Sequence, residues 1–183
     1  MKIKLANVRL AFPDLWEATS INDGEPRFGA CFIVEPGSAN AKTLDAAIAE
    51  VAKEKWQGKI SLDELAKKDK VCFRHFEKTN ASGDVYGGFE DMYWVQASNP
   101  SRPLIIDRDK SPLTQADGRP YSGCYVNVQI DIWAQDNKYG KRVNATLSGV
   151  QFSKDGDAFS SGAPASQDDF DDLSGGSDAD DMV

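Results

Sequence analysis

A chain of 183 residues is long enough for one domain with a sizeable core, and hydrophobic and aromatic contents of 40% and 10% exclude a wholly disordered protein. No stretch approaches the roughly 18 apolar residues of a membrane-spanning helix, and the first residues lack a signal-peptide pattern. We therefore expect a soluble, cytoplasmic protein with no membrane partner. Cys31, Cys72, Cys124 and the single histidine, His75, form no metal or disulfide pattern. No cofactor or metal is predicted, and the cysteines are expected to be buried thiols.

Charge is distributed unevenly along the chain. All 21 Lys and Arg lie at or before Lys154, whereas nine of the 29 acidic residues follow it, so the formal charge is +1 up to Lys154 and −9 beyond. From Ser160 onward the sequence is small, polar and acidic, and such a composition buries too little apolar area to offset chain entropy. We therefore predict a folded domain over residues 1–159 and a disordered acidic tail over residues 160–183.

The first part of the chain combines two strands with a helical segment. Alternation predicts a strand over 2–10 that ends or bends at Phe12-Pro13, and an apolar run predicts a buried strand over 28–34. Apolar residues at helical spacing then predict an amphipathic helix over 40–55, with Ser38 or Asn40 as its cap. A capping box at Ser61–Glu64 predicts a second, short helix that ends near residue 68.

Strand patterns return in the second half of the chain, over 71–78, 86–97 and 104–107. The clearest strand is 124–135, where strict alternation indicates one buried and one wet face. A hairpin turn at 136–140 leads to a partner strand over 141–152, in which Gly149 is expected to mark a bulge. Six or seven short strands with an inserted helix predict a mainly β protein, either a small β-barrel or a sandwich. An OB-fold-like β-barrel is the leading architecture.

Catalytic patterns are weak in this sequence. His75 alternates with Val71 and Phe73, which favours a core or boundary position over a catalytic base. Paired acids in loops, Asp107 with Asp109 or Asp155 with Asp157, leave a Mg²⁺-dependent nuclease open as the alternative function. Solvated loop acids are the commoner situation, so we expect a non-enzymatic protein.

Aromatic and basic side chains share otherwise polar strand faces. Unpaired bases offer ring faces for stacking and phosphates require cations, so this mixture predicts sequence-independent binding of single-stranded nucleic acid. The alternative is that Tyr125 and Trp133 pack under the inserted helix and that the cations are ordinary solvated residues. The candidate binding residues are Arg74, Phe76, Lys78, Tyr125, Trp133, Lys138, Tyr139, Lys141 and Arg142.

The acidic tail has two interpretations. A flexible polyanion attached to a domain with cationic patches can occupy the nucleic-acid groove at high effective concentration, and Phe170 and Leu173 are then candidate contacts for a partner protein. The other interpretation is a solubilising end. A protein that mimics nucleic acid would instead spread its acids over the folded domain, and the near-neutral residues 1–154 argue against that class.

Several segments together carry a resemblance to a known family. They are the opening strand with Leu10-Ala11-Phe12-Pro13, the helix after the second strand, residues 119–127 (Arg-Pro-Tyr-Ser-Gly-Cys-Tyr-Val-Asn), Gly149-Val150-Gln151 and the Asp-rich end. The chain resembles bacteriophage single-stranded DNA-binding proteins of the OB-fold, acidic-tail type. The resemblance implies coating of single-stranded DNA without base specificity during phage replication or recombination, and contacts between the tail and replication proteins. The chain ends on Asp181-Met182-Val183, whereas some phage tails of this kind end on an aromatic residue.

Overall fold

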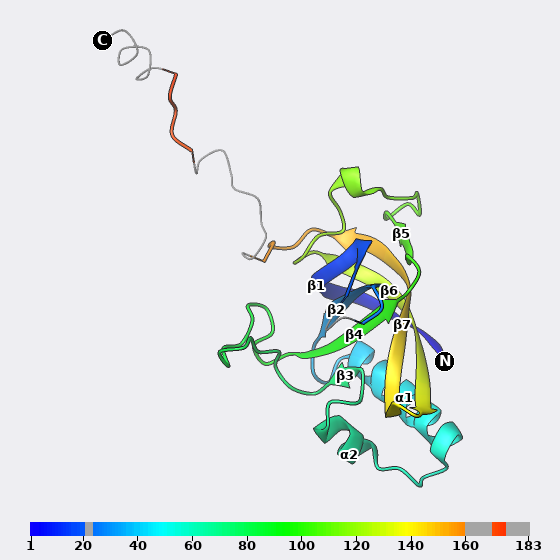
Figure 1. The fold of residues 1–183 in the computed structure, drawn as a ribbon. Helices are drawn as coiled ribbons and strands as arrows, with labels where there is room; N and C mark the ends of the chain where they lie inside the picture. Colours follow the sequence, from blue (N-terminus) through cyan, green and yellow to red (C-terminus); the bar gives the residue numbers. More distant parts are fainter. Residues whose placement is uncertain (21–23, 160–169, 175–183) are drawn as a thin grey trace.

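The computed structural model describes residues 1–20, 24–159 and 170–174. One sheet has the strand order β3-β4-β2-β1-β6-β7-β5, and a parallel pairing of β4 with β7 closes β4, β2, β1, β6 and β7 into a barrel (Figure 1). This confirms the predicted OB-fold-like barrel. The elements are β1 Lys2–Thr19, β2 Arg27–Val34, α1 Ala39–Trp56, α2 Leu62–Lys67, β3 Phe73–Arg74, β4 Tyr93–Asn99, β5 Leu104–Ile106, the 3₁₀ helix η1 Gln115–Asp117, β6 Tyr125–Asn137 and β7 Gly140–Lys154.

The β6–β7 hairpin follows the alternation of its sequence. Every second residue of β6 from Val126 to Ile132 is buried, whereas Tyr125 is half-buried and Trp133 is 41% exposed. Gln129 pairs with Gly149 but Ile130 pairs with Leu147, so β7 carries an extra residue beside Gly149. The predicted bulge is confirmed, and it allows buried residues on both sides of the break to face the same core.

The first strand is longer than predicted. β1 continues past Phe12-Pro13 to Thr19, and its pairing with β2 shifts in register between Ala11 and Asp14. Phe12 has a φ of +48°, in the left-handed region that bulky residues rarely occupy. The chain therefore bends at Phe12 and does not end there.

Two other predicted strands are shorter in the structure. β3 contains only Phe73–Arg74, and β4 begins at Tyr93, so the alternation over 71–78 and 86–92 was misleading. The segment between them, residues 75–92, projects from the side of the barrel and is called here the β3–β4 loop (Figure 1). Gly88 and Asp91 have φ values of +90° and +58°, and the chain turns at both residues.

Both helices begin where their caps predicted. The Ser38 hydroxyl accepts a hydrogen bond from the Ala41 amide at 3.2 Å, and the Ser61 hydroxyl accepts one from the Glu64 amide at 3.3 Å. The two helices lie at one end of the barrel, where α1 contacts β1, β6 and β7 (Figure 1). Trp56 Nε1 donates to Asp136 Oδ2 at 3.0 Å, which ties the end of α1 to the β6–β7 hairpin.

Residues 155–159 fold back onto the barrel. Tyr121 Oη donates to Asp155 Oδ1 at 2.7 Å, and Arg9 Nη2 donates to the Asp157 carbonyl at 2.6 Å. Phe159 packs against a small second core on the outer face of the sheet, and the Arg9 guanidinium lies 4.2 Å from its ring centroid. The predicted tail lies outside the described residues except for 170–174, in which Phe170 and Leu173 are exposed.

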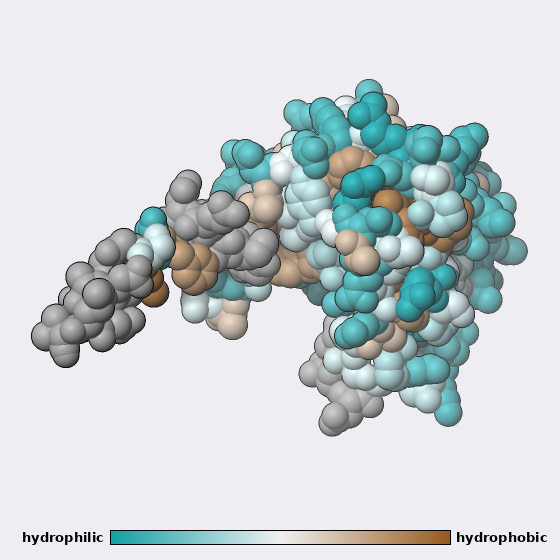
Figure 2. Space-filling view, turned by 90° about the horizontal axis from the view of Figure 1, so that it is seen from above, coloured by the Kyte–Doolittle hydropathy of each residue, from teal (hydrophilic) through white to brown (hydrophobic). Residues whose placement is uncertain are grey.

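Two simpler predictions can also be compared with the structure. All three cysteines are free and buried, as expected, and burial raises the pKa of the Cys72 thiol to about 12. Among the described residues, no helix is long and apolar enough to cross a membrane. The surface seen from above is mostly hydrophilic, with small hydrophobic patches (Figure 2).

Candidate nucleic-acid interface

A polar cleft of about 420 Å³ lies on the outer face of the barrel, between β7 and the β3–β4 side of the sheet. Period-2 alternation explains its polarity, because Gln96 and Ser98 of β4 and the outward-facing residues of β7 are hydrophilic. The cations that line the cleft are Arg27, Arg74 and Arg142, and the other side chains facing it include Trp133, Gln135, Asn144, Thr146, Gln96 and Ser98.

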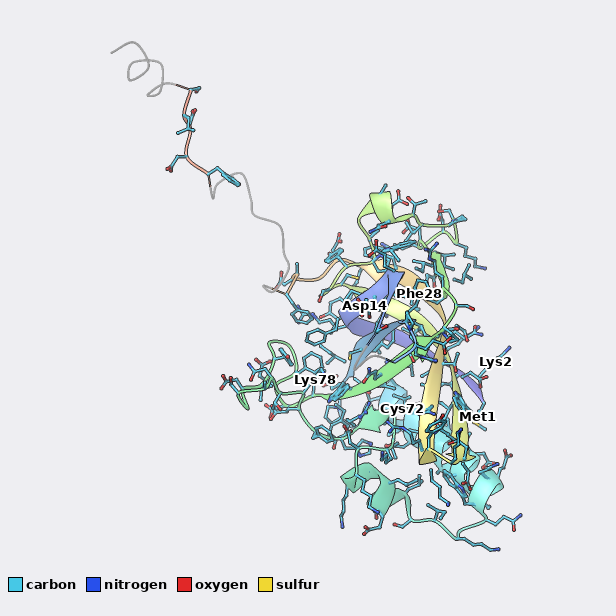
Figure 3. The ribbon with its side chains drawn as sticks, viewed as in Figure 1. Met1, Lys2, Asp14, Phe28, Cys72 and Lys78 are labelled. Carbon is cyan, nitrogen blue, oxygen red and sulfur yellow. The ribbon has the colours of Figure 1, made fainter. Side chains whose placement is uncertain are left out.

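A second cleft, of about 550 Å³, continues the first. The two share Arg27, Gln96 and Ser98, so together they form one groove that crosses β7, β4, β2 and β1. This combined surface is called the groove below. Figure 3 labels four residues that line it: Asp14 and Phe28 toward one end of the face, and Cys72 and Lys78 toward the other.

The hairpin end of the groove carries Trp133 and Arg142. Trp133 Nε1 donates to Thr146 Oγ1 at 3.0 Å, which fixes the indole against β7 while leaving much of the ring exposed. Arg142 forms no ion pair with any described residue, so its charge is available to an anion.

The tip of the same hairpin extends beyond the groove lining. Tyr139 is highly exposed, with Lys138 Nζ 5.1 Å from its ring centroid, and Lys141 Nζ lies 3.6 Å from Asp136 Oδ1. The structure therefore places Lys138, Tyr139 and Lys141 next to the groove, on the strands that carry Trp133 and Arg142, but outside its walls.

On the β3–β4 side of the groove, three predicted residues gather around Trp94. The Arg74 guanidinium carbon lies 4.7 Å and Lys78 Nζ lies 4.1 Å from the Trp94 ring centroid, and Phe76 meets the same ring edge to face. The sequence predicted that these side chains share one face of a strand over 71–78, but β3 ends at Arg74. They nevertheless converge because the β3–β4 loop folds over β4.

Sequence reasoning missed four groove-side residues: Phe12, Arg27, Tyr86 and Trp94. The bend at Phe12 leaves its ring 41% exposed, 4.9 Å from the Tyr86 ring in an edge-to-face contact and 5.7 Å from Lys78 Nζ. The period-2 series Trp94, Gln96 and Ser98 was a usable signal, since it puts a large ring on a polar strand face. Arg27 offered no comparable signal.

Tyr125 lies apart from the other candidates. It shares a face of β6 with Trp133, but eight residues of extended strand separate the two side chains, a distance of roughly 26 Å. Tyr125 pairs with Arg9 and Lys154, and Lys154 Nζ lies 4.8 Å from its ring centroid. Tyr125 is not among the residues that line the groove.

The paired loop acids are engaged within the chain. Asp107 Oδ2 accepts a hydrogen bond from Arg119 at 2.6 Å, and the amide and hydroxyl of Ser111 donate to Asp109 Oδ1. These hydrogen bonds hold the pKa of each carboxyl below its ordinary value. In the part of the chain that the structure describes, no three potential metal ligands come together.

The expected core or boundary position of His75 is wrong. Its side chain is about half exposed, its ring stacks on Tyr93, and Nε2 lies 2.9 Å from Asp45 Oδ1. The reason is that β3 ends at Arg74, so alternation no longer directs His75 into the core, although its ring still meets Phe73 edge to face at 4.7 Å.

Comparison with known proteins identifies the family. The sequence model described as "Enterobacter phage Enc34, ssDNA-binding protein" matches residues 1–183. The chain belongs to this family. The Enc34-family chain is 44% identical over 178 residues to protein p50 of Acyrthosiphon pisum secondary endosymbiont phage 1, with 95% of each chain covered.

Solved structures agree with this family assignment. The single-stranded DNA-binding protein of bacteriophage Enc34, in complex with ssDNA, matches with a TM-score of 0.73 and 26% identity, covering 86% of this chain and 89% of that one. The bacteriophage T7 protein gp2.5 matches with a TM-score of 0.56 and 8% identity, over 90% and 98% of the two chains, a likeness of fold alone. The predicted phage family and the non-enzymatic expectation are confirmed, and the nuclease alternative gains no support.

Proposed function

We propose that this Enc34-family protein binds single-stranded DNA along the groove without sequence preference. The observation that carries the proposal is one continuous groove with cations along its length and aromatic rings at both ends. Cations attract every phosphate and ring faces stack on every base, so neither contact depends on sequence. The related Enc34 protein, which has been solved with ssDNA, supports the same ligand class.

The aromatic residues favour single strands over duplexes. Trp133 and Phe12 expose ring surface at opposite ends of the groove. In a duplex the bases stack on one another and pair through their edges, so their faces are not available to protein rings. A single strand exposes those faces, and each base that stacks on an aromatic side chain contributes about 1 to 3 kcal/mol.

The test is a titration of single-stranded and double-stranded oligonucleotides, followed by fluorescence anisotropy at several salt concentrations in the presence of Mg²⁺. We expect tighter binding to the single strand, little difference between base compositions, a clear loss of affinity with salt, and intact oligonucleotides. Equal affinity for duplex and single strand, or loss of oligonucleotide length, would contradict the proposal.

We also propose that the acidic segment 160–183 competes with DNA for the groove. Phe159, the residue before this segment, packs on the second core that contains Trp94 and Cys31, and Cys31 lines the groove. Deleting residues 160–183 removes seven aspartates and no cation, which changes the formal charge from −8 to −1. The truncated protein should bind single strands more tightly at low salt, and the difference should shrink as salt screens both effects. Equal affinities across the salt series would refute competition.

The biological setting is a further part of this proposal. We propose that the protein protects single-stranded DNA in the cytoplasm of the infected host during phage replication or recombination, and that Phe170 and Leu173 contact a replication or recombination protein. Both side chains are exposed among acidic residues, an arrangement suited to an apolar pocket with a basic rim. A Phe170→Ala, Leu173→Ala variant should lose binding to purified phage replication proteins and keep its affinity for single-stranded DNA. Unchanged binding to those proteins would refute the assignment.

A further inference from the structure

Trp94 shares a strand face with the groove floor but does not line the groove. Alternation on β4 places Trp94 on the same side as Gln96 and Ser98, which do line it. Trp94 is nevertheless only 5% exposed. The side chains over its ring are those of Arg74, Phe76 and Lys78, and two of these are cations.

The two cations share one ring. The Arg74 guanidinium carbon and Lys78 Nζ both lie within 5 Å of the Trp94 centroid, so the same indole contacts two like charges. Arg74 is anchored, since its Nε donates to Asp69 Oδ1 at 2.8 Å and its Nη1 to the Cys72 carbonyl at 3.3 Å. Lys78 forms no ion pair with any described residue, and its contacts are to the Trp94 and Phe12 rings.

The face of the indole, not its N–H group, makes these contacts. Trp94 Nε1 is buried and has no hydrogen-bond acceptor among the described residues. The negative face of an aromatic ring attracts cations, which offsets part of the repulsion between Arg74 and Lys78. Arg74, which is ion-paired with Asp69, lines the first cleft and Lys78 lines the second, so the Trp94 ring holds one cation in each part of the groove.

We propose that Trp94 is a positioning residue that holds Arg74 and Lys78 as a two-cation clamp for a backbone phosphate of single-stranded DNA. This inference rests on the proposed function, because it assigns one subsite of the same groove. It adds that Trp94 acts through the cations and does not stack on a base, since the cations cover its ring.

The experiment compares the salt dependence of single-strand affinity for the full-length protein and six variants. Lys78→Met should reduce the slope of log K against log salt by about one unit, because one phosphate contact is lost. Trp94→Leu keeps both cations but removes the ring, and we expect it to reduce the slope at least as much as Lys78→Met does. Trp94→Phe keeps a ring face and should retain most of the slope. The double variant, with both Trp94→Leu and Lys78→Met, should have nearly the same slope as Trp94→Leu alone. A lysine that Trp94 no longer positions makes no phosphate contact, so its removal changes little.

Lys42→Met, on an exposed position of α1 outside the groove, is the matched control for removal of a charge and should leave the slope near the wild-type value. Thermal unfolding of each variant separates folding from binding. A Trp94→Leu variant that has a lower Tm but a wild-type slope would overturn the proposal, because Trp94 would then serve packing alone. A loss of affinity without a change in slope would also overturn it, since that is the signature of base stacking.

Three further outcomes complete the test and keep the clamp distinct from the proposed function. Should Trp94→Leu fail to fold, Lys78→Met decides, because a wild-type slope in that variant overturns the clamp by itself. If the wild-type protein binds single strands and Arg142→Met flattens the slope while Lys78→Met does not, the clamp is refuted and the groove stands. Absence of single-strand binding by the wild-type protein refutes both.

Discussion

Trp133 and Tyr125 form a natural matched pair for testing where DNA lies. Both are aromatic residues on the outward face of β6, but Trp133 lines the groove and Tyr125 does not. We predict that Trp133→Ala weakens single-strand binding and that Tyr125→Ala leaves it almost unchanged. The comparison holds the strand and face constant and varies only the position along the strand.

The size of the Trp133 effect follows from what the substitution removes. A base that loses its stacking partner loses about 1 to 3 kcal/mol, which corresponds to a dissociation constant raised about 5- to 150-fold. No charge is removed, so the salt slope should stay constant. Trp133 is 41% exposed and its side chain donates a hydrogen bond to Thr146, so the cost to folding should be about 1 kcal/mol. The folded fraction at the assay temperature therefore remains close to one.

Anisotropy titrations of a labelled oligonucleotide at four or more salt concentrations, together with urea unfolding, measure these quantities. Three results would refute the reasoning. One is an unchanged affinity for Trp133→Ala, and another is a change in its salt slope comparable to that of a lost cation. The third is a loss of affinity for Tyr125→Ala as large as that for Trp133→Ala, which would mean that DNA follows β6 along its length and not the groove.

Arg142→Met should flatten the salt slope by roughly one unit in the same titrations, because it removes a groove cation that has no ion pair among the described residues. Gly123→Ala should lower the free energy of unfolding by about 2 kcal/mol or more in urea titrations, since φ is +106° and a Cβ there meets the backbone of residues 157 and 158. Gly83→Ala, at φ +86° but in open space, is its control and should cost less. Because the Arg119 hydrogen bond lowers the pKa of Asp107 in the folded state, its stabilising contribution is present at neutral pH and is lost on acidification below about pH 4. Asp107→Asn should therefore make the free energy of unfolding fall less between pH 5 and pH 3, by urea denaturation at each pH, and an unchanged pH profile would contradict this.

Elements whose pattern is local could be predicted from the sequence. The alternation of β6, the bulge near Gly149 and the Ser38 cap of α1 each depend on residues that are close together in the chain. The β3–β4 loop depends instead on left-handed residues such as Asp91, which the sequence does not distinguish from residues of a strand. Alternation alone therefore extended β3 and β4 too far.

The groove could be predicted only in part, for a different reason. Trp133 and Arg142 belong to one hairpin, so the sequence relates them directly. Arg27 joins them only because β4 pairs with β7 and closes the barrel, a contact between strands about 50 residues apart in the chain. Trp94 is covered by the β3–β4 loop, and the sequence does not predict the path of that loop. Tyr125 illustrates the opposite error, since a shared strand face does not imply a shared site along a long strand.

Residues 119–127, one of the segments that carry the family resemblance, serve the fold and not the groove. Gly123 donates its amide to the Leu10 carbonyl at 2.8 Å, and Tyr121 donates to Asp155, so the segment fastens residues 155–159 onto the barrel. Such packing tolerates few residue types, because a Cβ at position 123 has no space. DNA binding without sequence preference restricts the residue types of the groove less, since any cation can contact a phosphate and any exposed ring can stack on a base. A motif can therefore reveal the family of such a protein while the residues that bind DNA stay dispersed through the chain, and only the closed barrel brings them into one groove.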